Sequence, residues 1–272
     1  MSPGAAAVAR ERHVGLFARF FGRLGSGTLA LCEELGGMFV LLIRVLLALV
    51  PPRLDGRELW RNLYKMGVQS VPIVILTAIF VGGIMVIQAG MFVRRFNAYS
   101  MVGWGAGYST FREVGPILIG LMFSGRVGSN NTAELGTMVV TEQIDGLRSL
   151  AIDPVRYLLV PRVLAMVLMS FLLCVIGDVV AIAGGLVFAK LMLGVDFAVF
   201  YSSFADNLKT WDMWHGLIKS AIFGLVIALS SCHFGLTVRG GAVGVGRAVN
   251  AAVVAAAVGI MVLDYFLTYI LK

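Results

Sequence analysis

Residues 66–93 read MGVQSVPIVILTAIFVGGIMVIQAGMFV and contain no charged side chain. A helix needs about 20 predominantly apolar residues to cross the hydrocarbon core of a bilayer. This stretch is long enough, and Arg94 and Arg95 follow it directly. It therefore predicts a membrane-spanning helix.

The composition of the whole chain is that of a membrane protein. Of its 272 residues, 59% are hydrophobic and 14% are charged, and the mean hydropathy is +0.91. Soluble domains contain roughly 45–50% apolar and about 25% charged residues. The apolar runs are continuous and do not alternate as barrel strands do. We therefore predict an all-α, polytopic membrane protein.

Five membrane-spanning helices are expected in a transmembrane domain over residues 66–272. Their approximate bounds are 66–93, 103–125, 157–190, 214–236 and 248–271.

The preceding residues, 1–65, are expected to form amphipathic helices at the cytoplasmic membrane surface. In a helix over residues 12–24, apolar side chains would lie on one side and three arginines on the opposite side. This arrangement is typical of a helix that lies on a membrane. Residues 28–50 are apolar but contain three charged side chains, so their uncharged runs are too short to span. We expect an interfacial or re-entrant helix there, with a sixth span as the alternative.

Positive charge is distributed unevenly among the predicted loops. Segments 1–67, 124–162 and 237–248 contain 15 of the 22 Lys and Arg residues. Because cytoplasmic loops carry an excess of these residues, the N-terminus is expected in the cytoplasm and the C-terminus in the periplasm of a bacterial inner membrane. Arg94 and Arg95 oppose this orientation. Membrane orientation explains the net charge of +7 better than a nucleic-acid partner does.

Arg112 and Glu113 interrupt the second predicted span. A charge at mid-membrane costs about 2.5–3.5 kcal/mol on insertion scales, so such residues are candidates for a functional site. Neighbours on a helix point about 100° apart, so the two need not pair with each other. A structural ion pair between helices and a polar pathway both remain open. Gly115 and Pro116 could loosen this helix, and Asp178 in the third span either bonds to another helix or serves transport.

The loop between the second and third spans contains an acidic, amphipathic pattern. A helix over about 130–147 would turn one acidic face outward, and Ile144 and Leu147 would lie opposite. A solvated surface helix is the plain alternative. Its position between two spans favours a docking surface for a cytoplasmic protein. The residues expected on this face are Glu134, Met138, Thr141, Glu142 and Asp145.

The chain contains no motif for nucleotide or metal chemistry. GxxxxGK[ST], HExxH and GxSxG are all missing from its sequence. Cys32, Cys174 and Cys232 are too widely spaced to suggest a zinc site or a disulfide framework. We expect no cofactor or metal in this chain.

Several motifs together resemble the MlaE (YrbE) permease family, the membrane subunits of MCE-associated lipid ABC transporters. The likeness runs from about residue 55 to the C-terminus. It rests on FREVGP (111–116), SGRVGSNNTAELGTMVVTEQIDGLRSLAIDPVRYLLVPR (124–162), LIKSAIFGL (217–225) and VLDYFLT (262–268).

The resemblance implies a homodimer of permeases. A dimer of cytoplasmic ATPase subunits, which bind ATP and Mg, would dock on the coupling helix at about 130–147. An MCE-domain protein would carry phospholipid or other hydrophobic molecules across the periplasm. Arg112 and Glu113 match the family's Arg-Glu pair near the lipid cavity, and Gln88 lies near a family glutamine. Asn130–Asn131 departs from the family pattern, in which small apolar residues are expected.

Two other functions stay possible from the sequence. An ion-coupled secondary transporter would use Asp178, Glu113 and Asp264 as a proton relay without an ATPase. An intramembrane hydrolase would use Ser230 or Ser231 with His233, but their adjacency at one helix end gives poor geometry between nucleophile and base.

Overall fold

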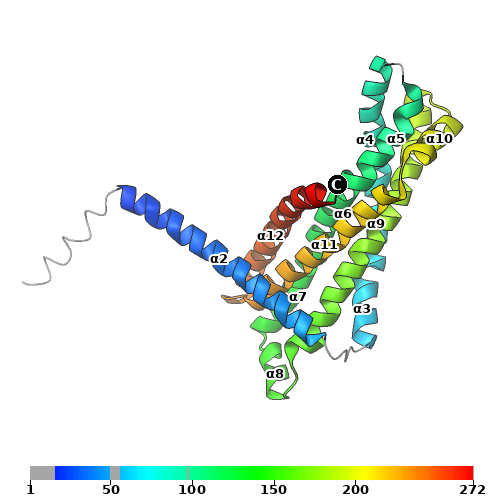
Figure 1. Ribbon diagram of the computed structural model, residues 1–272. Helices are drawn as coiled ribbons and strands as arrows, with labels where there is room; N and C mark the ends of the chain where they lie inside the picture. The colour runs from blue at the N-terminus through cyan, green and yellow to red at the C-terminus, as the bar shows by residue number, and fades with distance from the viewer. Residues whose placement is uncertain (1–15, 50–55, 97, 272) are drawn as a thin grey trace, which may run out of the picture. The chain divides into compact units, whose positions relative to one another are not determined.

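The computed structural model describes residues 16–49, 56–96 and 98–271, which form helices and turns and contain no strand (Figure 1). The all-α prediction is thereby confirmed. The chain divides into two compact units, Met1–Ile43 and Arg44–Lys272.

The helix α2 (Leu16–Ala48) is one uninterrupted helix of 33 residues. The re-entrant form expected for residues 28–50 is therefore wrong for the described residues up to 48, whereas the interfacial helix and the sixth span stay predictions. A re-entrant segment needs a turn, and Gly25, Gly27 and Gly36 leave the helix unbroken. Residues 12–15 and 50 lie outside the described residues.

The second unit is a bundle of long apolar helices joined by short ones. Four helical segments are long and apolar enough to cross a membrane, namely Gly56–Val93, Val155–Leu193, Thr210–Leu236 and Gly241–Ile270. The helices within and between them are α3 (Gly56–Met66), α4 (Val71–Phe96), α5 (Val102–Ser109), α6 (Gly115–Phe123), α7 (Ser129–Val140), α8 (Gln143–Ser149), α9 (Val160–Phe188), α10 (Phe197–Asn207), α11 (Thr210–Leu236) and α12 (Gly241–Ile270).

The α3 helix packs along α9 and therefore belongs with the bundle. The division between the two units falls at Ile43/Arg44, whereas the sequence suggested a boundary at residue 65.

The second predicted span, 103–125, is helical but irregular. The helices α5, α6 and α7 follow one another without a break, joined by π turns at Thr110–Val114 and Ser124–Gly128. Pro116 opens α6; because proline lacks an N–H and clashes with the preceding turn, a wider turn before it is favourable. This segment is not among the four described helices that qualify as spans by length and composition, so the fifth span remains an expectation.

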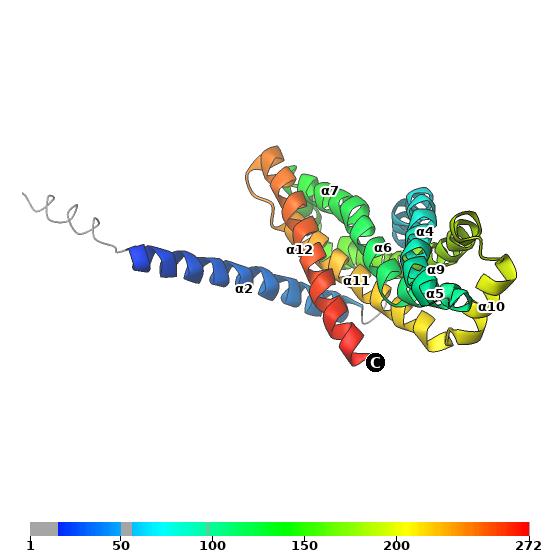
Figure 2. The ribbon, with the colours of Figure 1, turned by 90° about the horizontal axis from the view of Figure 1, so that it is seen from above.

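Close backbone contact holds the centre of the bundle together. A Cβ atom at Gly82 of α4 would lie 1.9 Å from the carbonyl oxygen of Ala181 in α9, so only glycine allows this approach. The α11 helix lies between α9 and α12 and packs against both (Figure 2). These contacts fix the helices that carry the intramembrane charges.

The α7 and α8 helices are separated at Thr141 and Glu142. Glu142 has a φ of 59°, in the left-handed region, so the predicted single coupling helix over 130–147 is wrong. The run Val139–Val140–Thr141 is β-branched, and such residues lose side-chain freedom in a helix. The Thr141 hydroxyl also donates to the carbonyl oxygen of Thr137 at 2.8 Å. The α7 helix therefore ends at a run of residues with low helix propensity.

Candidate functional site

A buried lysine lies at the centre of a cluster of opposite charges. Lys219 of α11 is 0% exposed; its Nζ lies 2.7 Å from Glu113 Oε2 and 2.9 Å from Asp264 Oδ1. It also donates to Thr268 Oγ1 at 2.7 Å and to the Arg112 carbonyl oxygen at 3.1 Å. These contacts join the π turn at 110–114, α11 and α12.

Arg112 pairs with a different acid. Its Nη1 lies 3.3 Å from Asp212 Oδ1 and donates to the Tyr108 hydroxyl at 2.8 Å, and the guanidinium lies 5.1 Å from the Tyr108 ring centroid. Asp212 also accepts from the backbone N–H of Lys209 at 3.1 Å and so caps α11. The expectation that Arg112 and Glu113 need not pair with each other is confirmed, since each forms an ion pair with another helix.

Lys219 and Asp212 were not predicted as site residues. Lys219 is the only Asp, Glu, Lys or Arg in residues 213–238, and this lone cation in an apolar helix was the available signal. His215 lies one turn from both residues, is 0% exposed and has no partner for either ring nitrogen among the described residues.

Asp178 is placed apart from the Lys219 cluster. It is buried against Gly115, where an added Cβ would lie 2.6 Å from Asp178 Oδ1, and Cys174 Sγ lies 3.7 Å from Oδ2. A cavity of about 10 Å³ adjoins these residues. Within the described chain no ion pair or hydrogen bond connects Asp178 to Glu113 or Lys219. The three acids of the proton-relay alternative therefore do not form one chain of contacts.

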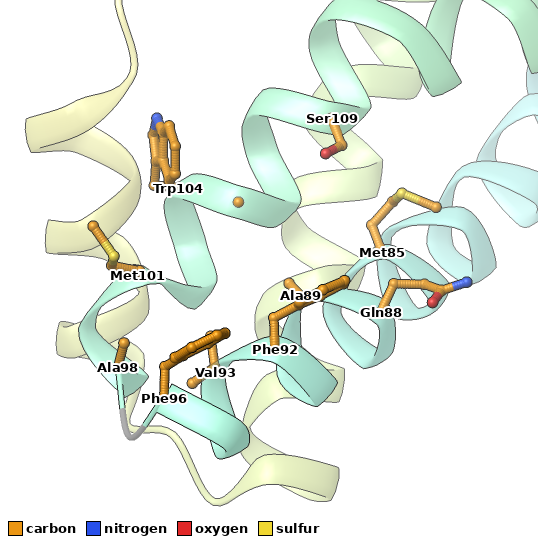
Figure 3. Close-up of a pocket in the computed structure, with 11 residues that line it drawn as sticks. Met85, Gln88, Ala89, Phe92, Val93, Phe96, Ala98, Met101, Trp104 and Ser109 are labelled. Carbon is orange, nitrogen blue, oxygen red and sulfur yellow. The ribbon is translucent and has the colours of Figure 1, made fainter.

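A larger groove of about 420 Å³ lies between α4 and α5. Figure 3 shows Met85, Gln88, Ala89 and Phe92 coming from the first of these helices and Trp104 and Ser109 from the second. Of the expected pathway residues, only Gln88 lines this groove. Arg112, Glu113, Gly115, Pro116 and Asp178 do not.

One helical face connects the groove to the buried charges. The rings of Trp104 and Tyr108 lie 5.7 Å apart, and Tyr108 in turn contacts Arg112. The α10 helix supports the same wall, because Ser203 Oγ accepts from the Trp104 backbone N–H at 3.1 Å. The α10 helix lies between the predicted spans 157–190 and 214–236, where the sequence predicted only a connection.

A second ion cluster lies at the other end of the bundle. Glu134 of α7 is 2.5 Å from Lys65 Nζ through Oε2 and 3.2 Å from Arg162 Nη2 through Oε1. Burial tends to raise the pKa of Glu134, but the charges of Arg162 and Lys65 outweigh it, so the pKa is lowered from 4.5. Arg162 also donates to Asn131 Oδ1 at 2.8 Å, and Asn131 donates to Ser231 Oγ at 2.9 Å. The unexpected Asn131 is thus a buried, hydrogen-bonded amide.

The expected docking residues do not share one face. Thr141, Glu142 and Asp145 are exposed around the turn between α7 and α8, and Met138 is half-buried. Glu134 points into the bundle toward Lys65 and Arg162, and the break after α7 separates Glu134 and Met138 from the other three residues.

The serines of the hydrolase alternative bond to their own helix. Ser230 Oγ donates to the Val226 carbonyl oxygen at 2.8 Å and Ser231 Oγ to that of Ala228 at 3.1 Å.

Most of the chain matches a described protein family. The family described as Permease MlaE matches residues 59–270. The chain belongs to the MlaE permease family. It is 34% identical to a probable ABC transporter permease protein of Rickettsia bellii over 245 residues, which covers 90% of this chain and 95% of the relative. A probable ABC transporter permease protein of Synechocystis is 36% identical over 239 residues, covering 88% and 91%.

A plant protein is also similar to this permease. Protein TRIGALACTOSYLDIACYLGLYCEROL 1, chloroplastic, of Arabidopsis thaliana is 36% identical over 222 residues, covering 79% of this chain and 63% of the plant protein. The family and the four apolar helices indicate that the chain is an integral membrane protein.

Proposed function

We propose that this permease is the non-catalytic transmembrane part of an ATP-driven transporter for phospholipid or another hydrophobic molecule. It would work as a homodimer in a bacterial inner membrane, with two cytoplasmic ATPase subunits that bind ATP and Mg and with an MCE-domain protein. The groove between α4 and α5 is the observation that carries the proposal. The glycolipid in the name of the Arabidopsis relative supports it.

The groove has the character of a lipid site. Its volume of about 420 Å³ lies within the range of roughly 300–1,000 Å³ that is usual for small-molecule pockets. Phe92, Phe96 and Trp104 offer apolar surface for an acyl chain, and Gln88 and Ser109 offer polar groups. Such a combination of apolar walls and few polar groups suits an amphipathic ligand.

The continuous helical run from α5 to α7 offers a mechanical connection. The exposed turn at Thr141 and Glu142 lies at one end of this run, and Trp104 lies in the groove near the other. Nucleotide-driven movement of an ATPase on this turn would shift the run and alter the groove. The pairs Arg112–Asp212 and Lys219–Glu113 would hold the run against α11 during that movement.

The groove is tested by filling it. Gly105 lines it, and a Cβ there would meet only Ala89 Cβ at 3.7 Å, so Gly105→Leu projects into open space. We expect lipid transfer by the reconstituted complex to fall about tenfold, because a filled pocket excludes its ligand. The matched control is Gly246→Leu in α12, where an added Cβ meets nothing within 4 Å. Equal transfer by both variants would remove the groove from the pathway.

The exposed turn at Thr141 and Glu142, on which the ATPase would dock, is called the docking turn and is tested by charge reversal. Glu142→Lys combined with Asp145→Lys should abolish co-purification of the ATPase, and Asp206→Lys on the exposed side of α10 should not. Transport by the purified chain under an ion gradient, without nucleotide, would instead establish the secondary-transporter alternative.

A further inference from the structure

A second, polar pocket of about 340 Å³ lies where α3 and the π turn after α6 meet α7. Its lining is different in kind from that of the groove between α4 and α5. The polar residues that line it are Lys65, Gln69, Arg126, Asn130, Asn131 and Glu134. Neither the proposed lipid pathway nor the docking turn uses this pocket.

The pocket has an excess of positive charge. Glu134 is its one acidic lining residue, and both of its oxygens already face cations, Lys65 and Arg162. Arg126 Nη1 donates to the Gln69 carbonyl oxygen, and no carboxylate among the described residues lies within ion-pair distance of Arg126. Since a guanidinium has five N–H donors, Arg126 can bind a further anion. The lining therefore contains two cations, Lys65 and Arg126, and one carboxylate, and that carboxylate is also paired with Arg162 outside the lining.

The pocket lies at the level expected for lipid headgroups. The apolar helix α4 begins at Val71, just after Gln69, and the apolar helix α6 ends at Phe123, just before Arg126. On α3, Trp60 is 73% exposed and Tyr64 is 55% exposed. Exposed Trp and Tyr are typical of the membrane interface, where phosphate groups also lie.

We propose that this pocket binds a phosphate group, supplied by the phosphodiester of a phospholipid in the adjacent leaflet. Arg126 would bind the phosphate oxygens through paired N–H donors, as guanidinium groups commonly do. Lys65 supplies a second positive charge, and the amides of Gln69 and Asn130 supply further donors.

The test uses the full-length permease in detergent, with bound lipid measured by native mass spectrometry. The probes are phosphatidylglycerol, diacylglycerol with the same acyl chains, and inorganic phosphate. We expect Arg126→Gln to weaken phosphatidylglycerol binding about tenfold, because one charge-assisted contact is lost, and to leave diacylglycerol binding unchanged. Asn130→Asp, at an exposed side chain, should weaken it in the same direction by adding a negative charge.

The control is Arg156→Gln, which removes a half-exposed arginine near the same end of the bundle that does not line the pocket. Phosphatidylglycerol binding equal to that of the control in both pocket variants would overturn the proposal, as would equal binding of diacylglycerol and phosphatidylglycerol by the unmodified chain. Binding of inorganic phosphate alone, lost in Arg126→Gln, would retain the anion site and identify a soluble anion as its source. Transport is not the readout, so failure here is distinct from failure of the proposed function.

Discussion

The two ion clusters of the bundle have opposite compositions. In the Lys219 cluster one fully buried cation faces two carboxylates, Glu113 and Asp264. In the Glu134 cluster one half-buried carboxylate faces two cations, Lys65 and Arg162. The first cluster lies among spanning helices, where each charge must be compensated by protein because lipid offers no partner. The second lies at the end of the bundle, where water and lipid headgroups can also compensate charge.

The α11 helix belongs to both clusters. Lys219 is one of its residues, and Ser231, which accepts from Asn131, is another about 18 Å further along at about 1.5 Å per residue. Substitution of one charged residue in either cluster should therefore measure how much the ion pairs of that cluster contribute to the stability of the bundle.

Lys219→Met should have the largest effect. The substitution leaves Glu113 and Asp264 facing each other without a cation, and loss of one partner from a buried ion pair costs about 3–5 kcal/mol of unfolding free energy. Denaturant unfolding in detergent would measure the loss. Lys190→Met is the control, because Lys190 pairs with Asp196 at an exposed site. Similar unfolding of the two variants would show that the buried cluster does not hold the bundle together.

Arg162→Met should have an intermediate effect. Arg162 is buried and donates to both Asn131 and Glu134, but Glu134 keeps Lys65 as a partner. We expect a loss of about 1–3 kcal/mol, the usual cost of leaving buried hydrogen-bonding groups unpaired. In the same unfolding measurement, Arg162→Met combined with Glu134→Gln should lose less than the sum of the two single losses, because both substitutions remove the same ion pair. Losses in the double variant that equal the sum of the two single losses would contradict a direct interaction between the two side chains.

The sequence predicted the helices of this protein better than their charge partners. Hydropathy identified four apolar helices because the signal is local and continuous. The partner of Glu113 lies more than a hundred residues away, at Lys219, and no local pattern specifies which helices meet. The charges themselves were visible, since Arg112, Glu113 and Lys219 interrupt apolar runs, but only packing shows that Arg112 and Glu113 face different acids and bases.

The coupling region shows a different limit of sequence analysis. Regular periodicity over 130–147 predicted one helix, whereas three consecutive β-branched residues and a left-handed Glu142 divide it. Because Glu134 belongs to the buried side of α7, its acidic side chain has a structural contact that its sequence position did not reveal. The low helix propensity of a few residues outweighed the amphipathic periodicity of the whole segment.

Acidification should have the smallest effect of the three changes. It acts on the half-buried carboxylate of Glu134 at the end of the bundle. The pKa of Glu134 is lowered in the folded chain below its ordinary value of 4.5, so folding favours its ionised form. Its contribution to stability is therefore complete above about pH 4.5 and is lost as the pH falls through the lower, folded value. At pH 7 we expect Glu134→Gln to melt about 2–4 °C below the unmodified chain, since the side chain is partly exposed and its ion pairs are screened. Differential scanning fluorimetry between pH 7 and pH 3.5 would follow the difference, which should narrow as the pH falls below about 4.5. A difference that stays constant over this range would show that the carboxylate charge of Glu134 contributes nothing, and that only the shape of the side chain matters at this end of the bundle.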